Sequence, residues 1–128
     1  GCHVTLLIVD DEPAVRNLVS SSLRGQEYLL LVASSGDEAM RVAAAHPGSI
    51  DLLLTDAMMP GQSGIELAHE LSALRPGLRV IVMSGYTSDM LGLSSIPQQV
   101  TMLQKPFTPQ ELRLRIREAL ASKKPSAI

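Results

Sequence analysis

Acidic side chains stand at the ends of two apolar segments that lie far apart in the sequence. Asp10 and Asp11 follow the first segment, and Asp56 comes within the stretch LLLTDAMMPG. Three clustered carboxylates repel one another unless a cation lies among them, and carboxylate oxygens are the ligands that Mg²⁺ prefers in proteins. If the fold brings these aspartates together, they predict a site for a hard divalent cation.

Two further polar residues follow later apolar segments. Ser84 follows LRVIVM and precedes Gly85, and Lys105 follows VTMLQ. An ammonium and a hydroxyl facing a metal ion suit an anion, most simply a phosphoryl group. We expect Ser84 to bond one of its oxygens, with Gly85 leaving space beside it. The main-chain carbonyl of Met58, two residues past Asp56, would lie within reach of a metal bound there.

The segments that lead to these residues are predicted strands. They are continuous runs of Val, Ile and Leu, which are typical of strands covered on both faces of a parallel sheet. The predicted strands are 4–9, 28–33, 51–55, 78–83 and 100–104. Helical patterns alternate with them at 13–23, 37–45, 64–74, 88–94 and 109–121. The pattern over 88–94 is the weakest, because glycine, serine and proline in and around it disfavour a helix.

This alternation predicts an α/β fold with a single doubly wound, five-stranded parallel sheet flanked by five helices. Ligands of such sheets bind beyond the carboxyl ends of the strands, where the strand order reverses. In the flavodoxin-like order 2-1-3-4-5, the first and third strands flank that point. Asp10, Asp11 and Asp56 would then share one crevice.

Taken singly, each of these residues also has a simpler interpretation. Asp10 or Asp11 could cap the first helix, Asp56 could be a turn residue, and Lys105 could be an ordinary lysine at a strand end. The separate interpretations do not explain why suitable groups follow all four strands. We therefore favour one shared phosphoryl site.

The composition indicates one globular domain and excludes several function classes. The chain has 128 residues, of which 45% are hydrophobic, and no apolar run reaches the roughly 20 residues of a bilayer span. A net charge of −2 and 2% aromatic residues argue against a nucleic-acid surface. The single cysteine, Cys2, cannot form an internal disulfide, so we expect a cytoplasmic protein. The lack of a spanning run predicts no membrane contact. The start at Gly1 lacks the features of a signal peptide, and we interpret it as a boundary within a longer parent.

Four motifs resemble the receiver domain of two-component response regulators, including the chemotaxis regulators. They are VDDEP at 9–13, TDAMMPGQSG at 55–64, MSGY at 83–86 and QKPF at 104–107. The resemblance covers residues 4–121 and leaves 1–3 and 122–128 as termini or linker. The expected strand order comes partly from it. The stretches SGYTSD and LQKPFTPQEL are most similar to receivers attached to hybrid sensor histidine kinases.

The resemblance implies a role for each acidic residue. Asp56 would accept a phosphoryl group from the phosphohistidine of a histidine kinase or a histidine phosphotransfer domain. Asp11, Asp56 and the carbonyl of Met58 would bind Mg²⁺ directly, and Asp10 would act largely through water.

Roles for the other site residues also follow from the resemblance. Lys105 would contact the phosphoryl oxygens, Ser84 would move toward them after transfer, and the peptide bond before Pro106 would be cis, which X-Pro bonds permit. The family often has an aromatic switch residue where this chain has Met102, so we expect that switch to be missing. Tyr86 would substitute for it or control water access to the acyl phosphate.

The implied function is that of a signalling phosphoacceptor and not of a conventional enzyme, with self-catalysed phosphotransfer and slow autodephosphorylation. The added charge would shift the conformation of the surface formed by the predicted elements at 88–94, 100–104 and 109–121. A homodimer through this surface is one option that the sequence leaves open.

Three alternatives fit parts of the pattern. A flavin-binding domain would need a hydroxyl- and glycine-rich loop after the first strand, where this chain has Asp-Asp-Glu. A phosphatase would need an acid–base residue beside Asp56, and Ala57 and Met58 offer none. A degenerate receiver domain that serves only for docking is disfavoured, because every residue of the predicted phosphoryl site is present.

Overall fold

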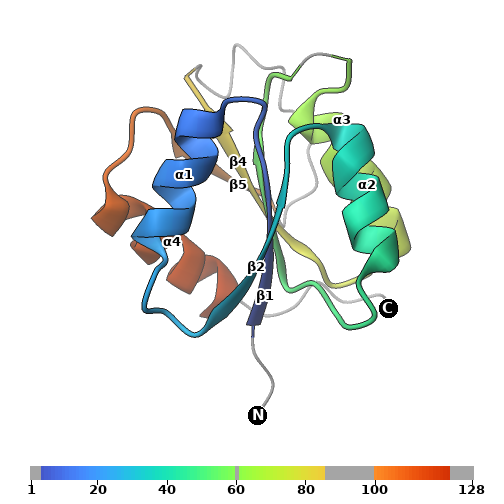
Figure 1. Ribbon diagram of the computed structural model, residues 1–128, viewed down its shortest axis with the longest axis horizontal. Coiled ribbons are helices and arrows are strands. Elements are labelled where there is room, and N and C mark those ends of the chain that lie inside the picture. Colours follow the sequence, from blue (N-terminus) through green and yellow to red (C-terminus); the bar gives the residue numbers. More distant parts are fainter. Residues whose placement is uncertain (1–3, 60, 86–99, 122–128) are drawn as a thin grey trace.

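The computed structural model describes residues 4–59, 61–85 and 100–121. Strands and helices alternate along most of this chain (Figure 1). The strands are β1 (Val4–Val9), β2 (Tyr28–Ala33), β3 (Leu52–Asp56), β4 (Arg79–Ser84) and β5 (Val100–Gln104). The helices are α1 (Pro13–Ser22), α2 (Gly36–Ala45), α3 (Gly64–Leu74) and α4 (Pro109–Ala121). In these described ranges, no helix combines the length and the hydrophobicity that crossing a membrane requires.

All five strands run parallel in the order β2-β1-β3-β4-β5, which confirms the predicted sheet and its strand order. Four helices flank the sheet in the described ranges, where five were expected. The predicted helix over 88–94 falls within 86–99, outside the described residues. The third and fourth strands each begin and end one residue later than predicted. Asp56 and Ser84 are therefore the last residues of their strands.

Helices cover both faces of the sheet, α1 and α4 on one side and α2 and α3 on the other (Figure 1). Leu6 and Ile8 of β1 belong to the core beneath α1 and α4, and Leu7 and Val9 belong to the core beneath α2 and α3. All four are fully buried. Burial of such a side chain contributes about 1.5–3 kcal/mol, so both layers hold the strand ends in place.

The helix starts differ in how they are capped. Ser63 and Glu66 form a capping box at the start of α3. The N-cap residue of α1 is Glu12, and its side chain makes no capping bond. The alternative that Asp10 or Asp11 is the N-cap residue of this helix is therefore wrong, although Oδ1 of Asp10 accepts the main-chain N–H of Glu12.

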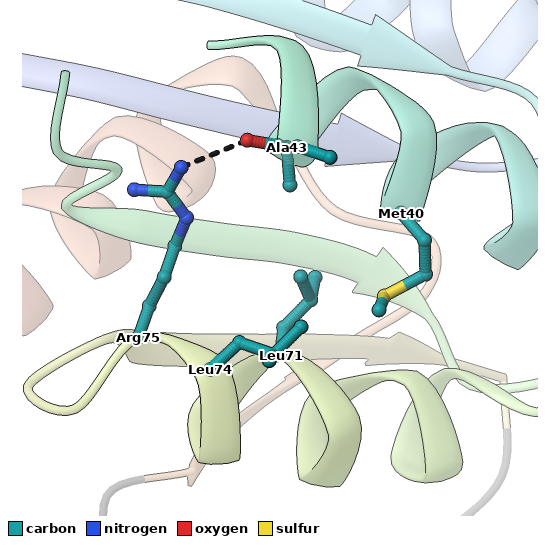
Figure 2. A pocket seen from close by; sticks show the side chains of 6 residues that line it. Met40, Ala43, Leu71, Leu74 and Arg75 are labelled. Carbon is teal, nitrogen blue, oxygen red and sulfur yellow. Dashed lines mark hydrogen bonds between the residues drawn. The ribbon is translucent and has the colours of Figure 1, made fainter. Parts of the chain in front are cut away.

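Arg75 ties the end of α3 to the end of α2. One guanidinium nitrogen donates to the carbonyl oxygen of Ala43 at 2.8 Å (Figure 2). The same nitrogen donates to the carbonyl of His46 at 3.3 Å, and the other terminal nitrogen donates to that of Gly48 at 3.0 Å. The last carbonyls of a helix carry partial negative charge, which a guanidinium neutralises. Beside this contact, a pocket of about 380 Å³ is lined by Met40, Ala43, Ala44, Leu71, Leu74 and Arg75.

We expect Arg75→Met to lower the free energy of unfolding by about 2 kcal/mol, because it removes charged hydrogen bonds while keeping an apolar stem. Urea unfolding followed by circular dichroism measures the change. Arg41→Met is the matched control, because Arg41 is exposed on α2. Equal losses in the two variants would contradict the proposed tie between the helices.

Candidate functional site

The register of the sheet brings two aspartates to the same level. Val9 of β1 lies opposite Thr55 of β3. The residues that follow them, Asp10 and Asp56, therefore stand side by side at the carboxyl edge of the sheet. The same edge is the expected location of a ligand site in a doubly wound sheet, because the strand order reverses between β1 and β3.

Lys105 follows the edge strand β5, and its side chain reaches this pair of aspartates. Its main-chain N–H donates to the carbonyl of Ser84 at 2.7 Å, which ties the ends of β4 and β5 together. Its peptide bond to Pro106 is cis. The ammonium nitrogen lies 3.3 Å from Oδ2 of Asp10 and 3.4 Å from Oδ1 of Asp56. One cation thus bridges carboxylates that follow or end two different strands.

A third carboxylate joins the cluster. Asp10, Asp11 and Asp56 each offer an oxygen that lies within 4.8 Å of the other two. Asp10 and Asp56 are buried and Asp11 is exposed. A single ammonium leaves an excess of negative charge among these groups. A cluster of oxygen donors with uncompensated charge fits Mg²⁺, which takes carboxylate oxygens and keeps several waters.

The two buried carboxylates differ in how their oxygens are used. Asp10 is fully buried, its Oδ1 accepts the N–H of Glu12 at 2.9 Å, and its Oδ2 contacts Lys105. Asp56 uses Oδ1 for both Lys105 and the N–H of Met58, which lies at the longer distance of 3.5 Å. Within the described ranges, no hydrogen bond or ion pair engages its Oδ2. Asp56 is therefore the buried carboxylate that retains an oxygen without a partner among the described residues.

The charges at the site shift two pKa values upward. Burial raises the pKa of Asp56, the nearby charge of Asp10 adds to this, and Lys105 and the Met58 N–H only partly oppose it. For Lys105, burial acts to lower the pKa, but the charges of Asp10 and Asp56 outweigh it and the net pKa is raised. Lys105 therefore stays an ammonium at neutral pH, and ionised Asp56 carries an energetic cost.

A sequence model of the response regulator receiver domain matches residues 6–117. The chain belongs to this family. The receiver domain is a module of two-component signalling, and the match includes the acidic cluster, Ser84 and Lys105. The predicted resemblance is confirmed at the level of the family.

Relatives of this receiver domain occur in proteins of different architecture. It is 33% identical over 123 residues to the probable transcriptional regulatory protein TcrX of Mycobacterium tuberculosis, covering 94% of this chain and 51% of that protein. It is 32% identical over 118 residues to the sensor kinase CckA of Brucella abortus, covering 91% of this chain and 12% of the kinase. The chain thus spans about half or less of the length of these curated relatives.

The fold is also similar to that of a solved receiver domain. The crystal structure of the receiver domain of the hybrid histidine kinase CckA superposes with a TM-score of 0.78 at 34% identity. The superposition covers 91% of this chain and 98% of that one. The similarity therefore extends over nearly the whole of a separately crystallised receiver.

The structure describes most of the remaining predicted site residues. Ser84 is buried at the end of β4, and Met58 is 57% exposed beside Asp56. Met102 is half-buried against the core beneath α2 and α3. Gly85 is exposed, and a Cβ built there would meet no atom within 4 Å in the described ranges, so the space expected at this position is open. Tyr86 lies outside the described residues.

Two residues at the receiver site were not predicted from the sequence. Gly64, the first residue of α3, packs so closely that a Cβ would collide with the main-chain carbonyl of Asp56. Arg16 of α1 donates from Nη1 to the main-chain carbonyl of Asp10 at 2.6 Å. The last glycine of TDAMMPGQSG and the basic residue one turn into the first helix were the available signals.

The raised pKa of Asp56 predicts a pH-dependent stability. At pH values between the ordinary pKa of Asp56, 3.8, and its raised pKa in the folded protein, the folded protein binds more protons at Asp56 than the unfolded chain does. The stability contributed by this group is therefore lost as the pH rises. Asp56→Asn removes the cost of ionising this buried carboxylate. In metal-free buffer, we expect the melting temperature of the variant to exceed that of the unsubstituted protein, by a margin that grows between about pH 4 and pH 7.

Scanning calorimetry over this pH range measures the margin. Glu70→Gln is the control, because Glu70 is an exposed carboxylate on α3, outside the cluster. A margin that is independent of pH, or equal in the control, would contradict the assigned cause.

Proposed function

We propose that this receiver domain, spanning residues 4–121, accepts a phosphoryl group on Asp56 from a phosphohistidine of a histidine kinase or histidine phosphotransfer domain. The observation that carries the proposal is the position of the Asp56 carboxylate and the engagement of only one of its two oxygens. It lies at the edge of the sheet with Oδ1 beside the Lys105 ammonium, while no described group engages Oδ2. Membership of the receiver family supports the same assignment.

The proposed metal ligands are Asp11, the carboxylate of Asp56 and the main-chain carbonyl of Met58, with Asp10 acting largely through water. The engagement of both Asp10 oxygens by Glu12 and Lys105 supports this division of roles. When bound, Mg²⁺ neutralises charge on the acidic groups and on the transferred phosphoryl group.

In the proposed transfer, a carboxylate oxygen of Asp56 forms a bond to phosphorus as the phosphorus–nitrogen bond of the phosphohistidine breaks and the imidazole leaves. The protein contributes mainly position and charge, as in other phosphoryl transfers. Lys105 contacts the phosphoryl oxygens, because its ammonium already lies beside the acceptor. Hydrolysis of the acyl phosphate by water then returns the carboxylate slowly.

The proposed response to this charge is a conformational shift. A side-chain phosphate adds roughly −1.5 to −2 charges at neutral pH, which favours a move of the Ser84 hydroxyl toward the phosphoryl oxygens. Lys105 and Ser84 lie at the ends of β5 and β4, so the surface formed by residues 88–94, β5 and α4 is the proposed output surface. A homodimer, where one forms, would use this surface. The family's aromatic switch is replaced by Met102, and Tyr86 is proposed to modulate the site instead.

We expect a single phosphoryl adduct after incubation with a small acyl-phosphate donor, detected by intact-protein mass spectrometry, and only when Mg²⁺ is present. Asp56→Asn should abolish the adduct, because the amide nitrogen replaces a carboxylate oxygen and removes the nucleophile. Asp37→Asn, at an exposed carboxylate of α2, should form it normally. An undiminished adduct in Asp56→Asn would overturn the assignment of the acceptor.

Lys105→Met should separate metal binding from transfer. The ammonium lies within 3.4 Å of two carboxylates, so its removal increases the negative charge available to a cation. We expect the dissociation constant for Mg²⁺, measured by isothermal titration calorimetry, to fall about threefold or more. The adduct should form at least about tenfold more slowly at saturating Mg²⁺, because charge stabilisation of the transfer is lost. Weaker Mg²⁺ binding, or an unchanged rate of transfer, would contradict the proposed role of the lysine.

A further inference from the structure

Asp10 and Asp11 are adjacent in the chain but are held in place to very different degrees. The main chain of Asp10 donates to the carbonyl of Ala33 in β2 at 3.2 Å, and its carboxylate contacts Glu12 and Lys105. Within the described ranges, no hydrogen bond or ion pair engages Asp11. The direction of the exposed Asp11 side chain therefore depends on the peptide group that joins it to Asp10.

One side chain holds the carbonyl of that peptide group. Nη1 of Arg16 donates to the main-chain oxygen of Asp10 at 2.6 Å, and Arg16 itself is half-buried. The main-chain N–H of Arg16 bonds to the carbonyl of Glu12 at 3.2 Å, within the first turn of α1. The guanidinium is thereby connected to the helix that starts at Pro13, two residues after Asp11. A charged donor at this distance makes one of the stronger classes of hydrogen bond.

We propose that Arg16 is a positioning residue of the phosphoryl site: it fixes the Asp10–Asp11 peptide so that the Asp11 carboxylate points at the metal position. This inference rests on the proposed function, because it assigns Asp11 to Mg²⁺. Arg16 acts through the main chain and touches neither the metal nor the phosphoryl group. Residues that orient metal ligands in this way typically change metal affinity about 10- to 100-fold when they are replaced.

The charge of Arg16 affects Mg²⁺ affinity in the direction opposite to its proposed positioning role. A cation near the acidic cluster repels Mg²⁺, so a role through charge alone predicts that loss of Arg16 tightens metal binding. A positioning role predicts that the same change weakens it. The sign of the change in affinity therefore separates the two effects.

The test compares Arg16→Met and Arg16→Lys with Arg24→Met in the full chain. Arg24 is exposed just beyond the opposite end of α1 and serves as the matched control. Isothermal titration calorimetry of Mg²⁺ into the unphosphorylated proteins gives the dissociation constants. Formation of the phosphoryl adduct at saturating Mg²⁺ gives the rate of transfer, and thermal unfolding without metal gives the stability.

We expect the Mg²⁺ dissociation constant of Arg16→Met to rise about tenfold, with the rate of transfer at saturating Mg²⁺ within about twofold of the unsubstituted protein. Arg16→Lys keeps a charged donor and should stay within about threefold in affinity. Arg24→Met should bind as the unsubstituted protein does. If Arg16→Met does not fold, Arg16→Gln supplies the comparison, because its shorter side chain also loses the bond to Asp10.

Two results would overturn the inference. They are an Mg²⁺ affinity of Arg16→Met that is unchanged or tighter, and an equal weakening in Arg24→Met. Either result, found while the unsubstituted protein binds Mg²⁺ and forms its adduct on Asp56, would leave the proposed function standing. Failure of the unsubstituted protein to bind Mg²⁺ would instead remove the proposed function itself.

Discussion

The ammonium of Lys105 lies between two buried carboxylates, and this contact governs the rest of the site. Asp10 and Asp56 come from neighbouring strands and would repel each other without a cation between them. The attraction outweighs the burial of Lys105 and keeps it protonated, while Asp56 remains harder to ionise than an isolated aspartate. The site therefore holds more negative charge than its own lysine neutralises, which favours a bound divalent cation.

The surrounding sheet keeps these charges close together. Both faces are covered by helices, and the central strands are buried along their length. A close-packed interior of this kind resists small displacements, so the carboxylates cannot simply move apart. Gly64 adds to this, because the start of α3 packs directly against the main chain of Asp56. Stability supplied by the two cores thus offsets the local cost of concentrated charge.

The site divides its groups into those that are held and those that are free to react. Asp10 is fixed through its main chain and both carboxylate oxygens, and Arg16 is bonded to its carbonyl. Asp56 retains one oxygen that no described group engages, and Asp11 is exposed at the rim. In the proposed function, the fixed groups provide the geometry for a metal ion and a phosphoryl group, and the free groups provide the ligands and the nucleophile.

The sequence by itself determined the strands, the parallel sheet and the polar residues at the strand ends, because apolar runs and turn residues are local signals. It did not determine which oxygens are engaged: the contact from Lys105 to Asp10 joins residues 95 positions apart and exists only in one strand register. Nor did it show that Glu12, and not an aspartate, is the N-cap residue of the first helix. The residue types show a basic side chain near the start of the first helix, but not that it bonds to the main-chain carbonyl of Asp10. Tertiary structure decided these points, because hydrogen bonds between distant groups depend on packing that no short segment encodes.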